Sequence, residues 1–239
     1  MFSTFSTKNR FIFISLLTIT GCSNTFNQVN SMIKESIIGL PSDNIPASQI
    51  DQSSFSSIYA RIDDAHQVYV LLALAENPQT IPATHRAKQT TELKWISSDA
   101  GMLVTRNGRL LKSVNLFYGN LINISSDQLD PIALGLHLTT TPMHWQSTID
   151  WQPGYHISYQ RQSTFTFVAD ETLVINETPI PLKRFDEHVF IPRLGLEYSN
   201  QFWIDATSGT VFKSHQKMAP NLPYIDITLL KPYSFKDIK

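Results

Sequence analysis

Acidic and imidazole side chains are the groups in this sequence that could carry acid–base or metal chemistry. Glu171, Glu187 and Asp205 would form a glycosidase-like pair only if the fold placed two carboxylates about 5 to 10 Å apart. Asp63 and Asp64 are adjacent, so on a strand they would point to opposite faces, and a turn is the better interpretation. The seven histidines have no spacing that favours a shared metal ion. We therefore predict no catalytic residue and no metal site.

Tryptophan side chains could bind a ligand, because their rings can stack on a sugar. The chain has 4 tryptophans, and aromatic residues make up 11% of it. Tryptophans in strands more often pack in a core, since they bury a large area. Trp95 and Trp203, together with the charged residues Arg106 and Asp205, are the candidate ligand-binding residues. Core packing stays open as the alternative for both tryptophans.

The first 21 residues have the parts of a secretory signal. Two basic residues, Lys8 and Arg10, precede a mainly apolar run, Phe11–Thr20, and no acid is present. As a helix this run would rise only about 15 Å, half of a hydrocarbon core that is ~30 Å thick. We therefore expect residues 1–21 to be a cleaved signal peptide rather than a membrane span.

Cys22 is the single cysteine of the chain, which excludes an intramolecular disulfide. It ends the sequence Ile19-Thr20-Gly21-Cys22, an aliphatic residue and two small residues before a cysteine, as in the bacterial lipobox. We predict cleavage between Gly21 and Cys22 and lipid on the thiol, with acyl chains such as palmitate as the membrane anchor and no other cofactor. Ser23 follows where an aspartate would signal inner-membrane retention in enterobacteria, so we expect the outer membrane, facing the periplasm.

The composition indicates a folded domain with few charges. Hydrophobic residues make up 42% of the 239 residues and charged residues 16%, with a formal net charge of −1. A core can be packed from this content. No basic surface for phosphates is indicated, so we expect no nucleic-acid partner.

The hydrophobic period changes from helical to strand-like along the mature chain. Apolar residues at spacings of three and four predict a short helix over 26–40, followed by a loop or tether over 41–54. From residue 55 to 239 the pattern is β-type, interrupted by a possible helix over 132–138. We divide the chain into a signal peptide (1–21), a lipidated N-terminus with helix and tether (22–54), and a β-rich periplasmic domain (55–239).

Tight turns separate the predicted strands. Asn107-Gly108 lies between alternating segments, which is a strong hairpin signal, and 206–209 marks a second hairpin. Residues 164–168 and 171–175 are predicted as separate strands. About a dozen short strands cannot stay flat. We expect an all-β domain of curled, mostly antiparallel sheets, open or half-barrel-like, with a short N-terminal helix after the lipid anchor.

Two segments carry a resemblance to a known family. Residues 93–109, LKWISSDAGMLVTRNGR, and residues 202–214, FWIDATSGTVFKS, resemble hairpins of the group 4 capsule polysaccharide lipoprotein family, the YjbF/GfcB type, and Lys231-Pro232 resembles its ending. The resemblance implies a β-rich outer-membrane lipoprotein encoded with components for capsule or exopolysaccharide export. It implies no catalytic residue, and the one functional residue it transfers is Cys22.

Three functions follow from these observations. The first is a non-enzymatic outer-membrane lipoprotein that assists export or assembly of a capsular or extracellular polysaccharide. Its partners would be the membrane through the lipid, polysaccharide export proteins, and the polysaccharide itself. The second is a lipid or lipoprotein carrier, which requires an apolar cup open to solvent. The third is a periplasmic polysaccharide-modifying enzyme, which requires two carboxylates converging in a cleft.

Overall fold

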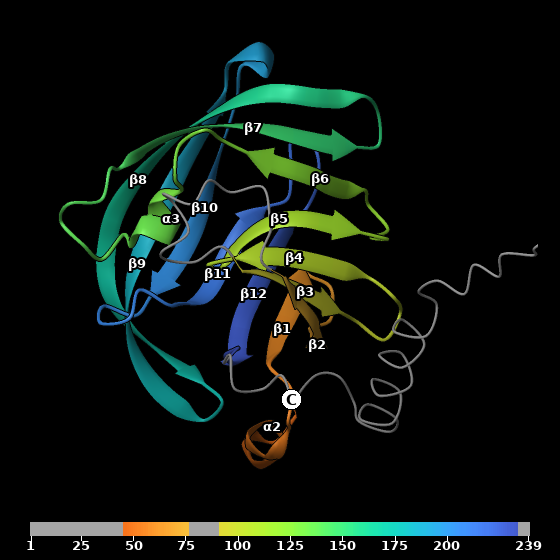
Figure 1. The fold of residues 1–239 in the computed structure, drawn as a ribbon, viewed down its shortest axis with the longest axis vertical. Helices are drawn as coiled ribbons and strands as arrows, with labels where there is room; N and C mark the ends of the chain where they lie inside the picture. Colours follow the sequence, from red (N-terminus) through yellow and green to blue (C-terminus); the bar gives the residue numbers. More distant parts are fainter. Residues whose placement is uncertain (1–44, 77–90, 234–239) are drawn as a thin grey trace, which may run out of the picture.

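The computed structural model describes residues 45–76 and 91–233. In this part of the chain, twelve strands form one antiparallel sheet (Figure 1). The strands are β1 (Ser57–Ile62), β2 (Val68–Glu76), β3 (Glu92–Ile96), β4 (Met102–Arg106), β5 (Arg109–Val114), β6 (Asn120–Ser125), β7 (His144–Gln152), β8 (His156–Ile175), β9 (Thr178–Ile191), β10 (Leu196–Ile204), β11 (Val211–Lys217) and β12 (Tyr224–Lys231). The prediction of an all-β, curled, antiparallel domain is confirmed.

The sheet curls until it is nearly closed. Successive strands pair from β1 to β5 and from β6 to β12, and β1 pairs with β12, so the order is β5-β4-β3-β2-β1-β12-β11-β10-β9-β8-β7-β6. The two edge strands are therefore β5 and β6, which follow each other in the chain and lie side by side (Figure 1). A sheet of this many strands must curl, and here the curl brings its two edges together.

Side chains join the two edges where no backbone ladder does. The backbone N–H of Leu121 donates to Ser113 Oγ at 3.0 Å, and the N–H of Leu116 donates to Asn120 Oδ1 at 3.1 Å. Ser113 Oγ also donates to Asn120 Oδ1 at 3.4 Å. We call this contact the seam. It satisfies backbone donors that an open edge would leave free.

Removing the Ser113 hydroxyl should destabilise the seam. Ser113 and Leu121 are both 1% exposed, so Ser113→Ala leaves a buried N–H without an acceptor. We expect the free energy of unfolding in urea to fall by about 1–3 kcal/mol. Ser125→Ala is the matched control, because that hydroxyl bonds Thr148 at an exposed site. Equal effects of the two substitutions would show that the seam bond contributes nothing special.

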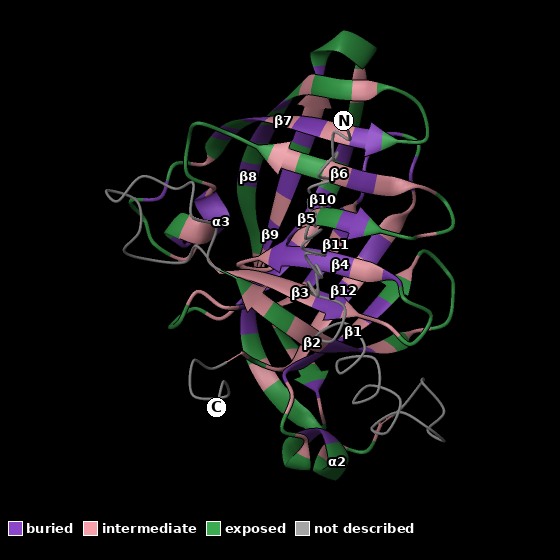
Figure 2. Ribbon diagram, turned by 45° about the vertical axis from the view of Figure 1, so that its right-hand side comes forward, coloured by how far each residue is buried: buried purple, intermediate pink, exposed green. Residues whose placement is uncertain are grey.

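Burial alternates along the strands, so each strand has one inward and one outward face (Figure 2). In β7, for example, Trp145, Ser147, Ile149 and Trp151 are buried and the residues between them are more exposed. The inward side chains form two apolar clusters, and a third, small cluster of Ile175, Leu182 and Trp203 lies apart from them. The largest cluster contains Ile58, Ala60, Val70, Trp95, Leu103, Leu110, Leu121, Ile149, Trp151, Val189, Ile191, Tyr198, Met218, Ala219, Leu222, Ile225 and Ile227.

The predicted turns are confirmed. Asn107 and Gly108, at φ 52° and 85°, join β4 to β5, as the two positive φ values of a tight hairpin turn require. Gly209, at φ 74°, closes the turn between β10 and β11. Asp63 and Asp64 lie in the turn between β1 and β2, where Asp63 Oδ1 accepts the backbone N–H of Tyr224 at 2.8 Å.

Two predicted strands, 164–168 and 171–175, are parts of one strand. β8 runs without a break over 20 residues, and β9 pairs with it along most of this length. A bulge between Phe167 and Ala169 shifts the register while the pairing continues. The bulge interrupts the alternation of apolar residues, which is why the sequence indicates two strands.

The short helices differ in detail from the prediction. The helix expected over 132–138 is α3 (Pro131–Leu134), which begins at Asp130, whose carboxylate accepts the N–H of Ile132 at 3.0 Å. The segment 41–54, predicted as loop or tether, contains α2 (Ala47–Gln52), held by the buried side chain of Ile50. Ile50 is the one large apolar residue among these six, which gives no helical period, so the sequence does not indicate α2.

The rest of the N-terminal prediction lies outside the described residues. This applies to the signal peptide, to Cys22 and to the helical pattern over 26–40. Within 45–76 and 91–233, each helix is too short or too polar to cross a bilayer. The described part thus consists of the curled sheet, α2, α3 and a single 3-10 turn, η2 (Pro192–Leu194).

Candidate functional site

Charged side chains meet in the interior of the sheet. Arg109 of β5, Arg161 of β8 and Glu187 of β9 are 1%, 2% and 0% exposed. Glu187 Oε2 accepts from Arg109 Nη1 at 3.0 Å, and Oε1 accepts from Arg161 Nη2 at 2.8 Å. Because β5 and β9 are not neighbours in the sheet, the Arg109–Glu187 pair spans the interior. Charged groups this deeply buried must be paired.

Two further residues complete this group, which we call the interior charge network. Asp130, the residue before α3, accepts from Nε and Nη2 of Arg109. Asn200 of β10 donates to Glu187 Oε2 at 2.7 Å. Two guanidinium groups thus face two carboxylates, and the formal charges balance. The network links β5, β8, β9 and β10 to the start of α3.

The network fixes the ionisation of Glu187. Burial alone would raise its pKa, but Arg109, Arg161 and Asn200 stabilise the carboxylate and lower the pKa to about 2. Burial alone would lower the pKa of the Arg109 guanidinium. The carboxylates of Asp130 and Glu187 outweigh this effect and raise the pKa of Arg109 above its ordinary value. A carboxyl group with so low a pKa holds no proton to donate at neutral pH, and Glu187 has no access to solvent.

The other two acids of the enzyme hypothesis are engaged in local structure. Glu171 accepts from Trp203 Nε1 at 2.7 Å and from Arg184 Nη1 at 2.8 Å. Asp205 accepts from the backbone and hydroxyl of Ser208, which lower its pKa. Each carboxylate has a structural task where it lies, and this counts against a catalytic pair made from Glu171, Glu187 and Asp205. Among the described residues, no group of three or more His, Cys, Asp or Glu is arranged to hold a metal ion.

The four predicted ligand-binding residues lie in two hairpins. Trp95 is 2% exposed, belongs to the largest apolar cluster, and donates to Thr105 Oγ1 at 2.8 Å. Arg106, at the end of β4, forms an ion pair with Glu92. Trp203 is 7% exposed, with Lys213 Nζ 5.0 Å from its ring centre. Trp95 and Trp203 therefore contribute to packing, and a ligand role for the four residues stays a prediction.

The filled interior bears on the carrier hypothesis. A carrier needs an open apolar cup, but the described interior holds Trp95, Trp145, Trp151 and Phe202 as well as the interior charge network. Arg109 lies 4.6 Å from the ring centre of Trp145, so charges and aromatic rings fill the space together. Packing of this kind within the described sheet counts against an acyl-chain carrier.

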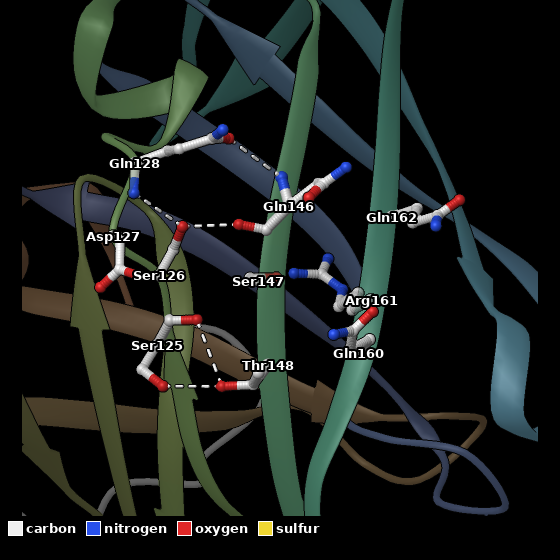
Figure 3. Close-up of a pocket in the computed structure, with 10 residues that line it drawn as sticks. All are labelled: Ser125, Ser126, Asp127, Gln128, Gln146, Ser147, Thr148, Gln160, Arg161 and Gln162. Carbon is white, nitrogen blue, oxygen red and sulfur yellow. Dashed lines mark hydrogen bonds between the residues drawn. The ribbon is translucent and has the colours of Figure 1, made fainter.

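A polar groove of about 340 Å³ lies on the outside of the sheet, beside β6, β7 and β8 (Figure 3). One wall is the end of β6 and the loop after it. The other wall and the floor come from β7 and β8. The lining residues are Ser125, Ser126, Asp127, Gln128, Gln146, Ser147, Thr148, Gln160, Arg161 and Gln162. We call this feature the glutamine groove.

Hydrogen bonds hold the loop wall of the glutamine groove against β7. Ser126 Oγ donates to the carbonyl of Gln146 at 2.5 Å, and Gln128 Oε1 accepts the N–H of Gln146 at 3.3 Å (Figure 3). The N–H of Gln128 donates to Ser126 Oγ at 3.0 Å. Further along, Ser125 Oγ and Thr148 Oγ1 are 2.8 Å apart. This wall is therefore ordered by its own contacts.

The register of β7 and β8 decides which side chains reach the groove. Gln146 lies opposite Gln162, and Thr148 opposite Gln160, with their side chains on the outer face. The pair between them, Ser147 and Arg161, is buried and points inward, so it forms the floor. The sequence alone does not indicate this site. The alternation in Gln160-Arg161-Gln162 was its only visible signal, and polar residues on an outer strand face are common.

Comparisons with known proteins give relatives of nearly full length. The family model described as group 4 capsule polysaccharide lipoprotein GfcB, YjbF matches residues 30–230. The uncharacterized lipoprotein GfcB of Escherichia coli (strain K12) is 29% identical over 220 residues, 92% of this chain and 96% of that protein. The uncharacterized lipoprotein YjbF of the same strain is 24% identical over 225 residues, 94% of this chain and 98% of that protein.

A solved structure has the same fold. The crystal structure of the hypothetical lipoprotein YmcC from Escherichia coli (K12) matches with a TM-score of 0.70 and 28% sequence identity. The match covers 90% of this chain and 100% of that chain. The match to that crystal structure therefore extends over almost the whole of the nearly closed twelve-stranded sheet.

Proposed function

The chain belongs to the group 4 capsule polysaccharide lipoprotein family, and from this membership we propose that it is an outer-membrane lipoprotein that assists export or assembly of an extracellular polysaccharide. It acts without catalysing a reaction, and lipid on Cys22 holds it on the membrane, facing the periplasm. Its partners are polysaccharide export proteins. The observation that carries the proposal is the family match, which extends over residues 30–230.

The described fold supports an accessory role. The described interior is filled by side chains and by the interior charge network, which supports an accessory role over a carrier of acyl chains. The acids that could have formed a catalytic pair are bound by arginine, tryptophan or turn donors. Within residues 45–76 and 91–233, the outer surface with its polar groove is available for interactions.

The membrane anchor is argued from the sequence. A basic segment, a short apolar run and two small residues precede Cys22, and lipid on that thiol would use the only cysteine of the chain. Several acyl chains bind a bilayer stably, since each buried methylene contributes about 0.8 kcal/mol. Ser23, rather than aspartate, favours the outer membrane.

A deletion strain tests the proposal. We expect surface and released polysaccharide to fall when the gene is removed, and the wild-type gene to restore them. Cys22→Ala should fail to restore polymer, because the protein loses its lipid, and Ser23→Asp should fail because the protein stays at the inner membrane. Ser23→Ala is the matched control and should restore polymer fully. Membrane fractionation and immunoblots report the place and amount of each variant.

Two results would contradict parts of this proposal. If the deletion leaves polymer unchanged in amount and structure, the export role is wrong. If Cys22→Ala restores polymer as well as the wild type does, the export role stands and the need for the anchor is wrong.

A further inference from the structure

We propose that the glutamine groove binds an uncharged, hydroxyl-rich stretch of a glycan chain. The inference deepens the proposed function, because the source of such a chain is the exported polysaccharide.

The size and shape of the groove suit part of a polymer. Its volume of about 340 Å³ falls at the lower end of the roughly 300–1,000 Å³ of small-ligand pockets. It lies on the outer face of the sheet between the loop wall and β8 (Figure 3). A site on an outer face can hold a few sugar units while the chain continues on either side. An enclosed pocket would instead select a free small molecule.

The accessible side chains suit hydroxyl groups. Gln146, Gln160 and Gln162 are exposed on the outer face of β7 and β8. Each amide offers two donors and one acceptor oxygen. A sugar hydroxyl is also both donor and acceptor, so it can bond to either end of an amide. Serine and threonine hydroxyls on the loop wall and on β7 add groups of the same kind.

The charges of the groove do not suit an anion. Among the ten lining residues, Arg161 is the one cation, and its guanidinium is buried and bound to Glu187 on the other side of the sheet. The exposed charge is Asp127, a carboxylate. A carboxylate or phosphate on the ligand would meet repulsion and no accessible cation. An uncharged segment avoids this cost.

The groove is partly ordered before a ligand binds. Ser126, Gln128 and Gln146 are joined by the hydrogen bonds that hold the loop wall on β7. The bonds to Gln146 engage its backbone, so the exposed glutamine side chains that a ligand must order are those of Gln146, Gln160 and Gln162. Binding therefore costs the conformational freedom of few side chains, which favours affinity.

The test measures binding of the strain's own polysaccharide. The probe is a set of oligosaccharides cut from extracellular polysaccharide of the strain that carries the gene, titrated into the mature lipoprotein in detergent by calorimetry. We expect saturable binding that the double substitution Gln160→Ala/Gln162→Ala weakens at least about tenfold. Thr166→Ala is the matched control, since Thr166 is exposed on β8 beyond the groove, and it should bind as the wild type does.

Charge is tested in the same titration. For an uncharged segment, affinity should change less than about twofold between roughly 0.05 and 0.5 M salt, because screening acts on charged pairs. Asp127→Asn should likewise leave the affinity within about twofold. A steep salt dependence, or a large gain of affinity in Asp127→Asn, would overturn the uncharged assignment. The assignment of the site would be wrong if no saturable binding is measured, or if the double substitution leaves binding intact.

The two proposals fail in different ways. A deletion strain with unchanged polymer overturns the export role, whatever the titration gives. A deletion strain that loses polymer and recovers it fully with Gln160→Ala/Gln162→Ala, while that variant binds normally, overturns the groove alone. If both are correct, the double substitution lowers binding and polymer together, and Thr166→Ala lowers neither.

Discussion

Replacing Glu187 by glutamine is expected to lower the free energy of unfolding by about 3–5 kcal/mol, because one carboxylate then remains for two buried arginines. Arg109 and Arg161 are 1% and 2% exposed, and both donate to Glu187. Glutamine has nearly the same shape, so the loss reports the missing charge rather than a cavity. Asp130 remains as a partner of Arg109, but Arg161 loses its charged acceptor.

Urea or guanidinium unfolding, followed by tryptophan fluorescence, measures this loss. Glu197→Gln is the matched control, because Glu197 is an exposed acid of the adjacent β10 that lies 3.6 Å from His188. An exposed pair of this kind contributes about 0–1 kcal/mol. Similar values for the two substitutions would mean that the interior charge network does not stabilise the fold.

Acid should act on the same carboxylate. The folded-state pKa of Glu187 is lowered from 4.5 to about 2. A group with a depressed folded pKa contributes stability that is present above the unfolded value and lost as pH falls through the folded value. Wild-type stability should therefore fall between about pH 4.5 and 2 more steeply than that of Glu187→Gln. The difference between the two curves isolates Glu187 from Asp205 and Asp226, whose pKa values are also lowered.

The sequence predicts the local parts of the fold well. Asn107-Gly108 and the turn at 206–209 are encoded by residues that tolerate positive φ, and their strands follow directly. The number of short strands predicts a curled sheet. These features depend on neighbours in the chain. The sequence does not predict β8 as one strand, because a bulge interrupts its alternation, and it does not predict α2, which has a single large apolar residue, Ile50.

The contacts across the interior could not be predicted in the same way. Arg109 and Glu187 are 78 residues apart in the chain and meet only because β5 closes the curled sheet opposite β9. The sequence shows both as ordinary charged residues in strands. Ser113 and Asn120 likewise look like turn-flanking polar residues, although they join the two edges. Closure decides their role, and closure is a property of all twelve strands together.

The candidate site shows the same limit. The tryptophans chosen for their chemistry are buried, and the exposed polar groove comes from residues that attract no notice in the sequence. The groove exists because β6 ends at Ser125 and the loop after it is held against Gln146. The facing glutamines then depend on the register of β7 with β8. Neither the end of β6 nor that register can be read from residue types alone.

Gly108→Ala is the second substitution with a large expected effect, because this turn packs against β11. An added Cβ would lie 2.4 Å from Val211 Cβ, and the φ of Gly108 is +85°. The carbonyl of Gly108 also accepts from Gln216 Nε2 at 2.9 Å, so the turn cannot move freely away. Backbone strain and overpacking each cost about 1–3 kcal/mol. We expect a loss larger than either cost alone, measured by chemical unfolding.

Gly195→Ala separates the two costs. Gly195 has φ +57°, but nothing lies within 4 Å of an added Cβ, so this control carries strain without a clash. Val211→Gly combined with Gly108→Ala should restore part of the stability beyond additivity, because it removes the three Val211 carbons that lie within 2.8 Å of the new Cβ. If Gly108→Ala costs no more than Gly195→Ala, or if the double variant is strictly additive, the turn does not press on β11. The hairpin of β4 and β5 would then be held to β11 by its hydrogen bonds with Gln216, and not by the packing of Gly108 against Val211.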